Sequence, residues 1–177
     1  MQTIEALASN TGIILLEYHT ADSLGTNETK DMYAGYSLLG TPSVVFNGAS
    51  GNQALLGPKS YEIYLNRVNL LKEQQSTLVI ESAVTVTTPL STSVKLYNLD
   101  NASLDGARVY GVIYQDLGTS ENHFVVRDIT PVQVFNLSSY TSATFELIST
   151  ETDSPNTHIV IIVKSFSGLI VQSQLVK

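Results

Sequence analysis

The chain has 177 residues, of which 43% are hydrophobic and 14% charged, so it can bury a core and does not have the composition of a disordered chain. Nine basic and sixteen acidic side chains give a net charge of −7, and the absence of a basic block argues against nucleic-acid binding. No apolar run approaches about 18 residues, so no membrane-spanning helix is expected. The absence of cysteine excludes disulfides, thiolate catalysis and cysteine metal sites in this chain.

The first 76 residues predict helices that alternate with short apolar strands. The segment over residues 1–10 is too short and too polar to contain the apolar region of a signal peptide. The run Ile13–Leu16 is typical of a strand buried on both faces, and Pro58 is typical of a helix start. In chain order we expect a helix over 4–8, a strand over 13–20, a helix over 27–38, strands over 43–46 and 53–56, and a helix over 58–75.

After Ser76 the apolar pattern changes to recurring strands separated by turn residues such as Pro89 and Ser167–Gly168. Seven strands rich in Val, Ile, Thr and Tyr predict an antiparallel β-sandwich over residues 77–177. In the sixth of them we expect Ile159, Ile161 and Val163 to face the core. The predicted strands cover 78–86, 92–98, 107–116, 123–135, 141–148, 157–164 and 169–176.

The order of elements in residues 1–76 resembles the thioredoxin superfamily after its first strand. Gly40–Gly48 is similar to that family's cis-proline loop and the hairpin that follows it. A narrower resemblance is to a bacterial, outer-membrane-associated family of thioredoxin-like proteins that often carry an immunoglobulin-like domain. It rests on Leu16–Thr20, Asp22 and Phe124–Ile129 and covers nearly the whole chain.

This resemblance implies a truncated thioredoxin-like α/β domain over 1–76, followed by an immunoglobulin-like antiparallel β-sandwich over 77–177. It implies that Thr41 and Pro42 bind an extended substrate, that their peptide bond is cis and that they lie close to His19. The alternative is a trans bond in an ordinary turn before a strand. The resemblance also implies a periplasmic or cell-surface location.

The superfamily's first strand and its Cys-X-X-Cys motif are absent, and thiol–disulfide exchange requires an attacking thiolate. Two functions are therefore open. One is a non-catalytic, extracytoplasmic binding or scaffold module whose partner is a protein or an extended peptide. The other is a fragment of a thiol–disulfide oxidoreductase whose cysteine motif lies upstream of residue 1.

Glu17, His19 and Asp22 follow the first predicted strand, at the sheet edge where functional loops gather. They form either the edge of a functional site or a cap for the next loop, and the pattern favours the cap. His19, His123 and His158 lack the spacing of metal ligands, so we expect no metal and no cofactor.

Without the first strand, the strands over 13–20 and 43–47 have unpaired backbone groups, and a buried unpaired group costs about 1–3 kcal/mol. Either the two strands pair directly in parallel, or another chain covers them. Direct pairing requires the helices on both faces to repack. The sequence analysis therefore predicts a homo-oligomer.

Overall fold

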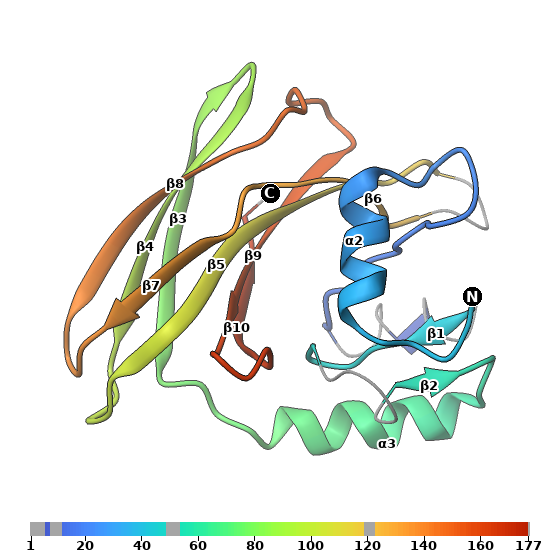
Figure 1. Cartoon of the computed structure of the whole chain (residues 1–177), viewed down its shortest axis with the longest axis horizontal. Helices are drawn as coiled ribbons and strands as arrows, with labels where there is room; N and C mark the ends of the chain where they lie inside the picture. Colours follow the sequence, from blue (N-terminus) through green and yellow to red (C-terminus); the bar gives the residue numbers. More distant parts are fainter. Residues whose placement is uncertain (1–5, 8–11, 49–53, 119–122, 177) are drawn as a thin grey trace.

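The computed structural model describes residues 6–7, 12–48, 54–118 and 123–176. Most of the regular secondary structure is β-sheet: a three-stranded and a five-stranded sheet form a sandwich, and a smaller N-terminal part lies beside it (Figure 1). The helices are α2 (Asn27–Gly35) and α3 (Tyr61–Lys72). The strands are β1 (Ser43–Val44), β2 (Leu55–Leu56), β3 (Leu78–Thr87), β4 (Leu90–Asn98), β5 (Leu104–Gln115), β6 (Val125–Ile129), β7 (Gln133–Leu137), β8 (Ser142–Ile148), β9 (Thr157–Lys164) and β10 (Ile170–Leu175).

The two sheets have the orders β3-β4-β8 and β10-β9-β5-β6, and β7 also pairs with β5; all these pairs are antiparallel. The apolar inner faces pack against each other to form the main core. Ile159, Ile161 and Val163 belong to it and are at most 2% exposed. Their predicted inward orientation is confirmed.

The predicted strand over 123–135 is wrong, because two strands occupy this range. Both pair with β5, β6 alongside its second half and β7 alongside its first half. The ladder stops at Pro131, which has no N–H to donate. Just before it, Thr130 N donates to the carbonyl of Gly111 and Gly111 N donates to Thr130 Oγ1, each at 2.9 Å.

The outer face of the five-stranded sheet is also buried. Val112, Val160 and Ile162 are at most 4% exposed and pack with Leu16 and Met32 of the N-terminal part. In Figure 1, α2 lies alongside this sheet. The long apolar run of β9 is therefore buried on both sides, a pattern more typical of parallel strands.

The predicted strand over 13–20 is wrong, because these residues make a single bridge to the sandwich and do not join a sheet with β1. Glu17 N donates to Phe124 O at 2.8 Å, and Val126 N donates to Glu17 O at 3.0 Å. In the described residues β1 pairs with β2 and no other strand. Direct pairing with 43–47 therefore does not occur. The sandwich edge satisfies the Glu17 backbone instead, and association with a second copy stays a prediction.

A second attachment joins the turn at Asn47–Gly48 to the hairpin turn at Ser167–Gly168. Asn47 O accepts from Ile170 N, and Asn47 Nδ2 donates to Ile170 O, both at 3.0 Å. Gly48 has φ +76°, and a Cβ on it would lie 2.9 Å from the carbonyl oxygen of Gly168. Only glycine fits this close approach without strain.

Candidate functional site

The structure brings Glu17, His19 and Asp22 together just before α2. His19 Nδ1 lies 2.7 Å from Asp22 Oδ2, and His19 Nε2 lies 4.0 Å from Glu17 Oε2. The side chains of Glu17, His19 and Asp22 are 5%, 15% and 56% exposed. The imidazole thus lies between a buried and an exposed carboxylate.

The first turn of α2 holds this loop in place. Thr26 and Thr29 form a reciprocal capping box at the start of the helix. Thr29 Oγ1 also donates to His19 O at 2.6 Å. A Cβ on Gly25 would lie 2.7 Å from His19 O, so the loop requires glycine at this position. The sequence pattern did not predict these contacts, because they depend on how the loop folds back on His19.

The contacts of His19 determine what this group can do chemically. Asp22 forms a hydrogen bond with His19 and accepts a second one at Oδ1 from Leu24 N, at 2.9 Å. These two hydrogen bonds hold the pKa of Asp22 below its usual range. Both imidazole nitrogens face carboxylates, so neither is directed toward a ligand. This geometry supports the interpretation that Glu17 and His19 stabilise the following loop.

Replacing His19 with alanine should raise the pKa of Asp22 toward its ordinary value, because the largest cause of the lowered pKa is removed. The Leu24 N–H remains, so the return should be partial. In the wild-type chain, Asp22 adds stability above its ordinary pKa, and this stability is lost as pH falls through the lowered value.

A carbon-13 NMR titration of the Asp22 carboxyl measures this change. His123→Ala is the control, because His123 pairs with Asp116 at 3.2 Å and should leave Asp22 unchanged. An Asp22 pKa that is the same in wild type and His19→Ala contradicts the assigned cause.

Thr41 and Pro42 lie elsewhere. Their peptide bond is cis, which confirms that prediction. Both residues are exposed, and Pro42 O accepts from Gly57 N at 2.8 Å at the base of the β1–β2 hairpin. Glu17, His19 and Asp22 precede α2, whereas Thr41 and Pro42 follow its other end (Figure 1). α2, a helix of nine residues about 13 Å long, lies between the two sets in the chain.

A buried lysine, which the sequence pattern did not single out, ends β9. Lys164 is 8% exposed, and its Nζ donates to Tyr36 OH at 3.1 Å and lies over the Tyr36 and Tyr110 rings at 4.8 and 5.7 Å. Burial, and secondly Arg108, lower the pKa of Lys164. Strand period could have revealed it, because Lys164 shares a face with Val160 and Ile162.

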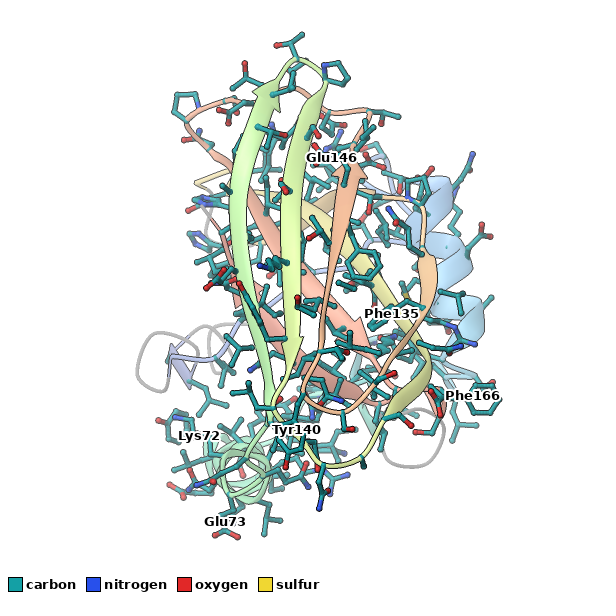
Figure 2. All side chains as sticks on the ribbon, turned by 90° about the vertical axis from the view of Figure 1, so that its left-hand side faces the viewer. Lys72, Glu73, Phe135, Tyr140, Glu146 and Phe166 are labelled. Carbon is teal, nitrogen blue, oxygen red and sulfur yellow. The ribbon has the colours of Figure 1, made fainter. Side chains whose placement is uncertain are left out.

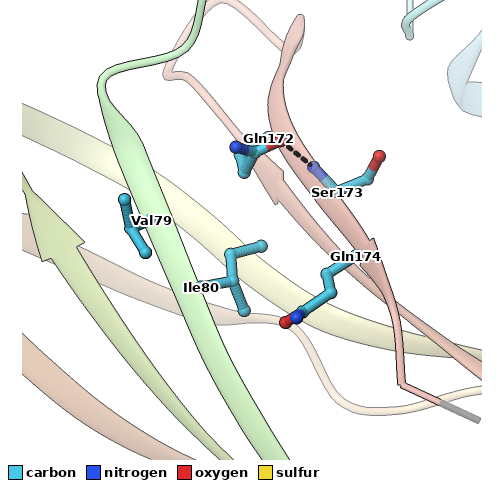
Figure 3. Close-up of a pocket in the computed structure, with 5 residues that line it drawn as sticks. All are labelled: Val79, Ile80, Gln172, Ser173 and Gln174. Atoms are coloured by element: carbon cyan, nitrogen blue, oxygen red, sulfur yellow. Dashed lines mark hydrogen bonds between the residues drawn. The ribbon is translucent and has the colours of Figure 1, made fainter.

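A shallow cavity of about 190 Å³ lies between the sheet edges at β3 and β10 (Figure 3). Its lining residues are Val79, Ile80 and 172–174. Gln172 Nε2 donates to Leu78 O at 2.9 Å, and Ser82 Oγ donates to Gln174 Oε1 at 3.0 Å. The glutamine side chains thus bridge the two sheets at this edge and are already engaged.

Within the residues that the structure describes, no three histidine, aspartate or glutamate side chains are grouped as a metal ion would require. None of the described helices is long and apolar enough to cross a membrane.

Comparison with known proteins shows the fold and corrects the family. HBP35 of Porphyromonas gingivalis has a TM-score of 0.73 and 10% identity, over 98% of this chain and 69% of that one. A protein from Agrobacterium tumefaciens has a TM-score of 0.66 and 16% identity, over 99% of this chain and 85% of that one. At these identities the similarity shows the fold alone.

No family model and no curated protein matches the sequence. The resemblance to a thioredoxin-like family is therefore wrong, because the similar solved structures, at 10% and 16% identity, share the fold alone and no other comparison supports that family. The motifs behind it have another explanation in the structure. Leu16 and Tyr18 pack on the outer face of the sandwich, and the segment at Pro42 begins a two-stranded hairpin.

Proposed function

We propose that the protein is a non-catalytic binding or scaffold module that acts outside the cytoplasm and binds its partner through the loops at one end of the sandwich. The sheet orders β3-β4-β8 and β10-β9-β5 resemble those of immunoglobulin-like domains. The surface strands, rich in Ser, Thr and Asn and poor in Lys, support an extracytoplasmic location. The expected partner is a protein or an extended peptide, and a second copy of this chain is included.

Three loops meet at this end: 99–103, 138–141 and 165–169, here called the loop end. Strand register places them together, because Leu104 pairs with Leu137 and Arg108 pairs with Lys164. The Asn98 side chain joins the first two loops, with Nδ2 donating to the carbonyl oxygens of 102 and 138 at 2.8 and 3.2 Å.

The observation that carries the proposal is the exposure of large apolar or aromatic side chains on all three loops. Leu99, Tyr140 and Phe166 are 57%, 72% and 74% exposed. Figure 2 shows Tyr140 and Phe166 toward the same end of the sandwich. Large exposed apolar side chains on neighbouring loops can form an interaction surface. In antibody variable domains, the loops that bind antigen lie at one end of the sandwich.

The test compares two triple variants of the whole chain. Leu99→Ser, Tyr140→Ser and Phe166→Ser alter the loop end. Val86→Ser, Leu117→Ser and Ile148→Ser are the matched control, because these side chains are also 39–54% exposed and lie toward the opposite end.

Each immobilised protein is exposed to an extracellular protein fraction, and a captured partner is purified for calorimetry. Light scattering tests a second copy as the partner. We expect the control to bind like wild type and the loop-end variant to bind at least about tenfold more weakly, equivalent to about 1.4 kcal/mol. Equal affinity of the loop-end variant, or the absence of any partner or self-association, refutes the proposal.

A further inference from the structure

Two cations occupy neighbouring positions on the outer face of the five-stranded sheet. Arg108 of β5 and Lys164 of β9 are cross-strand partners. Residues directly opposite in a sheet have their side chains on the same face, within about 5.5 Å at Cβ. Like charges in this arrangement destabilise a sheet. In a chain of net charge −7, their pairing requires an explanation.

The charge of Lys164 is poorly compensated within the described part of the chain. There, neither Lys164 nor Arg108 forms an ion pair with a carboxylate. The tyrosines beside Lys164 add no negative charge near neutral pH, because burial raises the pKa values of Tyr36 and Tyr110. An ammonium has three N–H donors, and Tyr36 OH accepts from one of them.

Two exposed apolar side chains, Val134 and Phe166, lie near Arg108. Val134 of β7 is the other cross-strand partner of Arg108 and is 68% exposed. Phe166 is 74% exposed. It packs against Gly106, two residues before Arg108, since a Cβ added to this glycine would lie 3.0 Å from Phe166 Cδ2. Arg108 is half-buried and Lys164 is 8% exposed, so a ligand that approaches from the solvent meets the guanidinium first.

We propose that Arg108 and Lys164 bind the carboxylate of a ligand whose apolar part contacts Val134 and Phe166. The guanidinium offers paired N–H donors that match a carboxylate, and the ammonium supplies a second cation from the interior. Tyr36 positions the ammonium through its hydroxyl. This site shares Phe166 with the loop end, but the proposal does not rest on the proposed function.

Hexanoate is the probe, because it joins one carboxylate to a short apolar chain. Nitrogen-15 NMR titrations of the whole chain at constant ionic strength should show saturable shifts at the amides of Arg108, Tyr110 and Phe166. Hexanamide has the same chain without the charge, so we expect it to bind at least about tenfold more weakly. Acetate and inorganic phosphate lack the apolar part and should also bind more weakly.

Arg108→Gln removes the accessible cation and should weaken hexanoate binding about tenfold. Lys164→Met measures how much the buried ammonium contributes to hexanoate binding. If this variant does not fold, Arg108→Gln alone decides the test. Lys95→Gln is the matched control, because Lys95 also lies over a tyrosine ring, 4.7 Å from the Tyr97 centroid, but is exposed on the other sheet.

A short peptide ending in leucine with a free carboxylate is compared with hexanoate, and the tighter ligand identifies the source of the carboxylate. Equal binding of hexanoate and hexanamide overturns the proposal. So does hexanoate binding that Arg108→Gln leaves unchanged, or tighter binding of phosphate than of either carboxylate. None of these readouts depends on capturing a protein partner.

Discussion

A fragment that spans residues 77–177 alone should expose apolar surface and self-associate at micromolar concentration. In the whole chain, the N-terminal part covers Tyr110, Val112, Val126, Val160 and Ile162 on the outer sheet face. All five are at most 4% exposed, and each fully buried side chain of this kind contributes about 1.5–3 kcal/mol. Removing residues 1–76 forfeits part of this burial and leaves an apolar patch in water.

Dye binding and light scattering measure this effect, with circular dichroism to check that the fragment keeps its strands. Val160→Thr and Ile162→Thr should have opposite effects in the two proteins, favourable in the fragment and unfavourable in the whole chain. In the fragment they make the exposed face more polar and should reduce association. In the whole chain they bury hydroxyls, which costs about 1–3 kcal/mol each. A fragment that is monomeric and binds no dye contradicts the prediction.

Replacing Asp128 with alanine should lower the free energy of unfolding by about 3 kcal/mol. Asp128 of β6 is 5% exposed, and its Oδ2 accepts from Ser149 Oγ at 2.5 Å, Thr150 N at 2.8 Å and Thr150 Oγ1 at 3.2 Å. Ser149 and Thr150 directly follow β8 in the three-stranded sheet. This carboxylate therefore links the two sheets, and its removal takes the acceptor from the buried Ser149 hydroxyl and from the partly buried Thr150 N–H.

Urea unfolding of the two-state transition measures the loss. Asp105→Ala is the matched control, because Asp105 is exposed and its Oδ2 accepts from the nearby Ser103 Oγ at 3.0 Å. We expect this control to lose less than about 1 kcal/mol. If Asp128→Ala also lowers the free energy of unfolding by less than about 1 kcal/mol, the carboxylate does not hold the sheets together.

Local patterns predicted the strands of the sandwich because alternation and turn residues depend on short stretches of chain. Ile159, Ile161 and Val163 illustrate this, and the position of Pro131 could also have predicted the break between β6 and β7. The pattern Ile13–Leu16 did not reveal its partner. A short apolar run is compatible with pairing in a sheet and with packing on a sheet face, and long-range contacts decide between them.

In the candidate site, too, contacts between residues close in sequence are predictable and contacts between distant residues are not. The proximity of Glu17, His19 and Asp22 follows from their closeness in sequence. The contact of Lys164 with Tyr36 joins residues 128 positions apart, so no local motif indicates it. The resemblance of the loop around Pro42 to a cis-proline loop predicted the peptide geometry correctly, but it did not establish a family.

The attachment of Asn47 to Ile170 affects how the protein folds during synthesis. The two residues are 123 positions apart in the chain. At about 5–20 residues per second, a ribosome needs roughly 6–25 s to make the intervening chain. During this interval, the N-terminal part has emerged but the turn that receives it has not been made. Its apolar side chains therefore depend on chaperones, or on their own small cluster, until the last hairpin of the sandwich is complete.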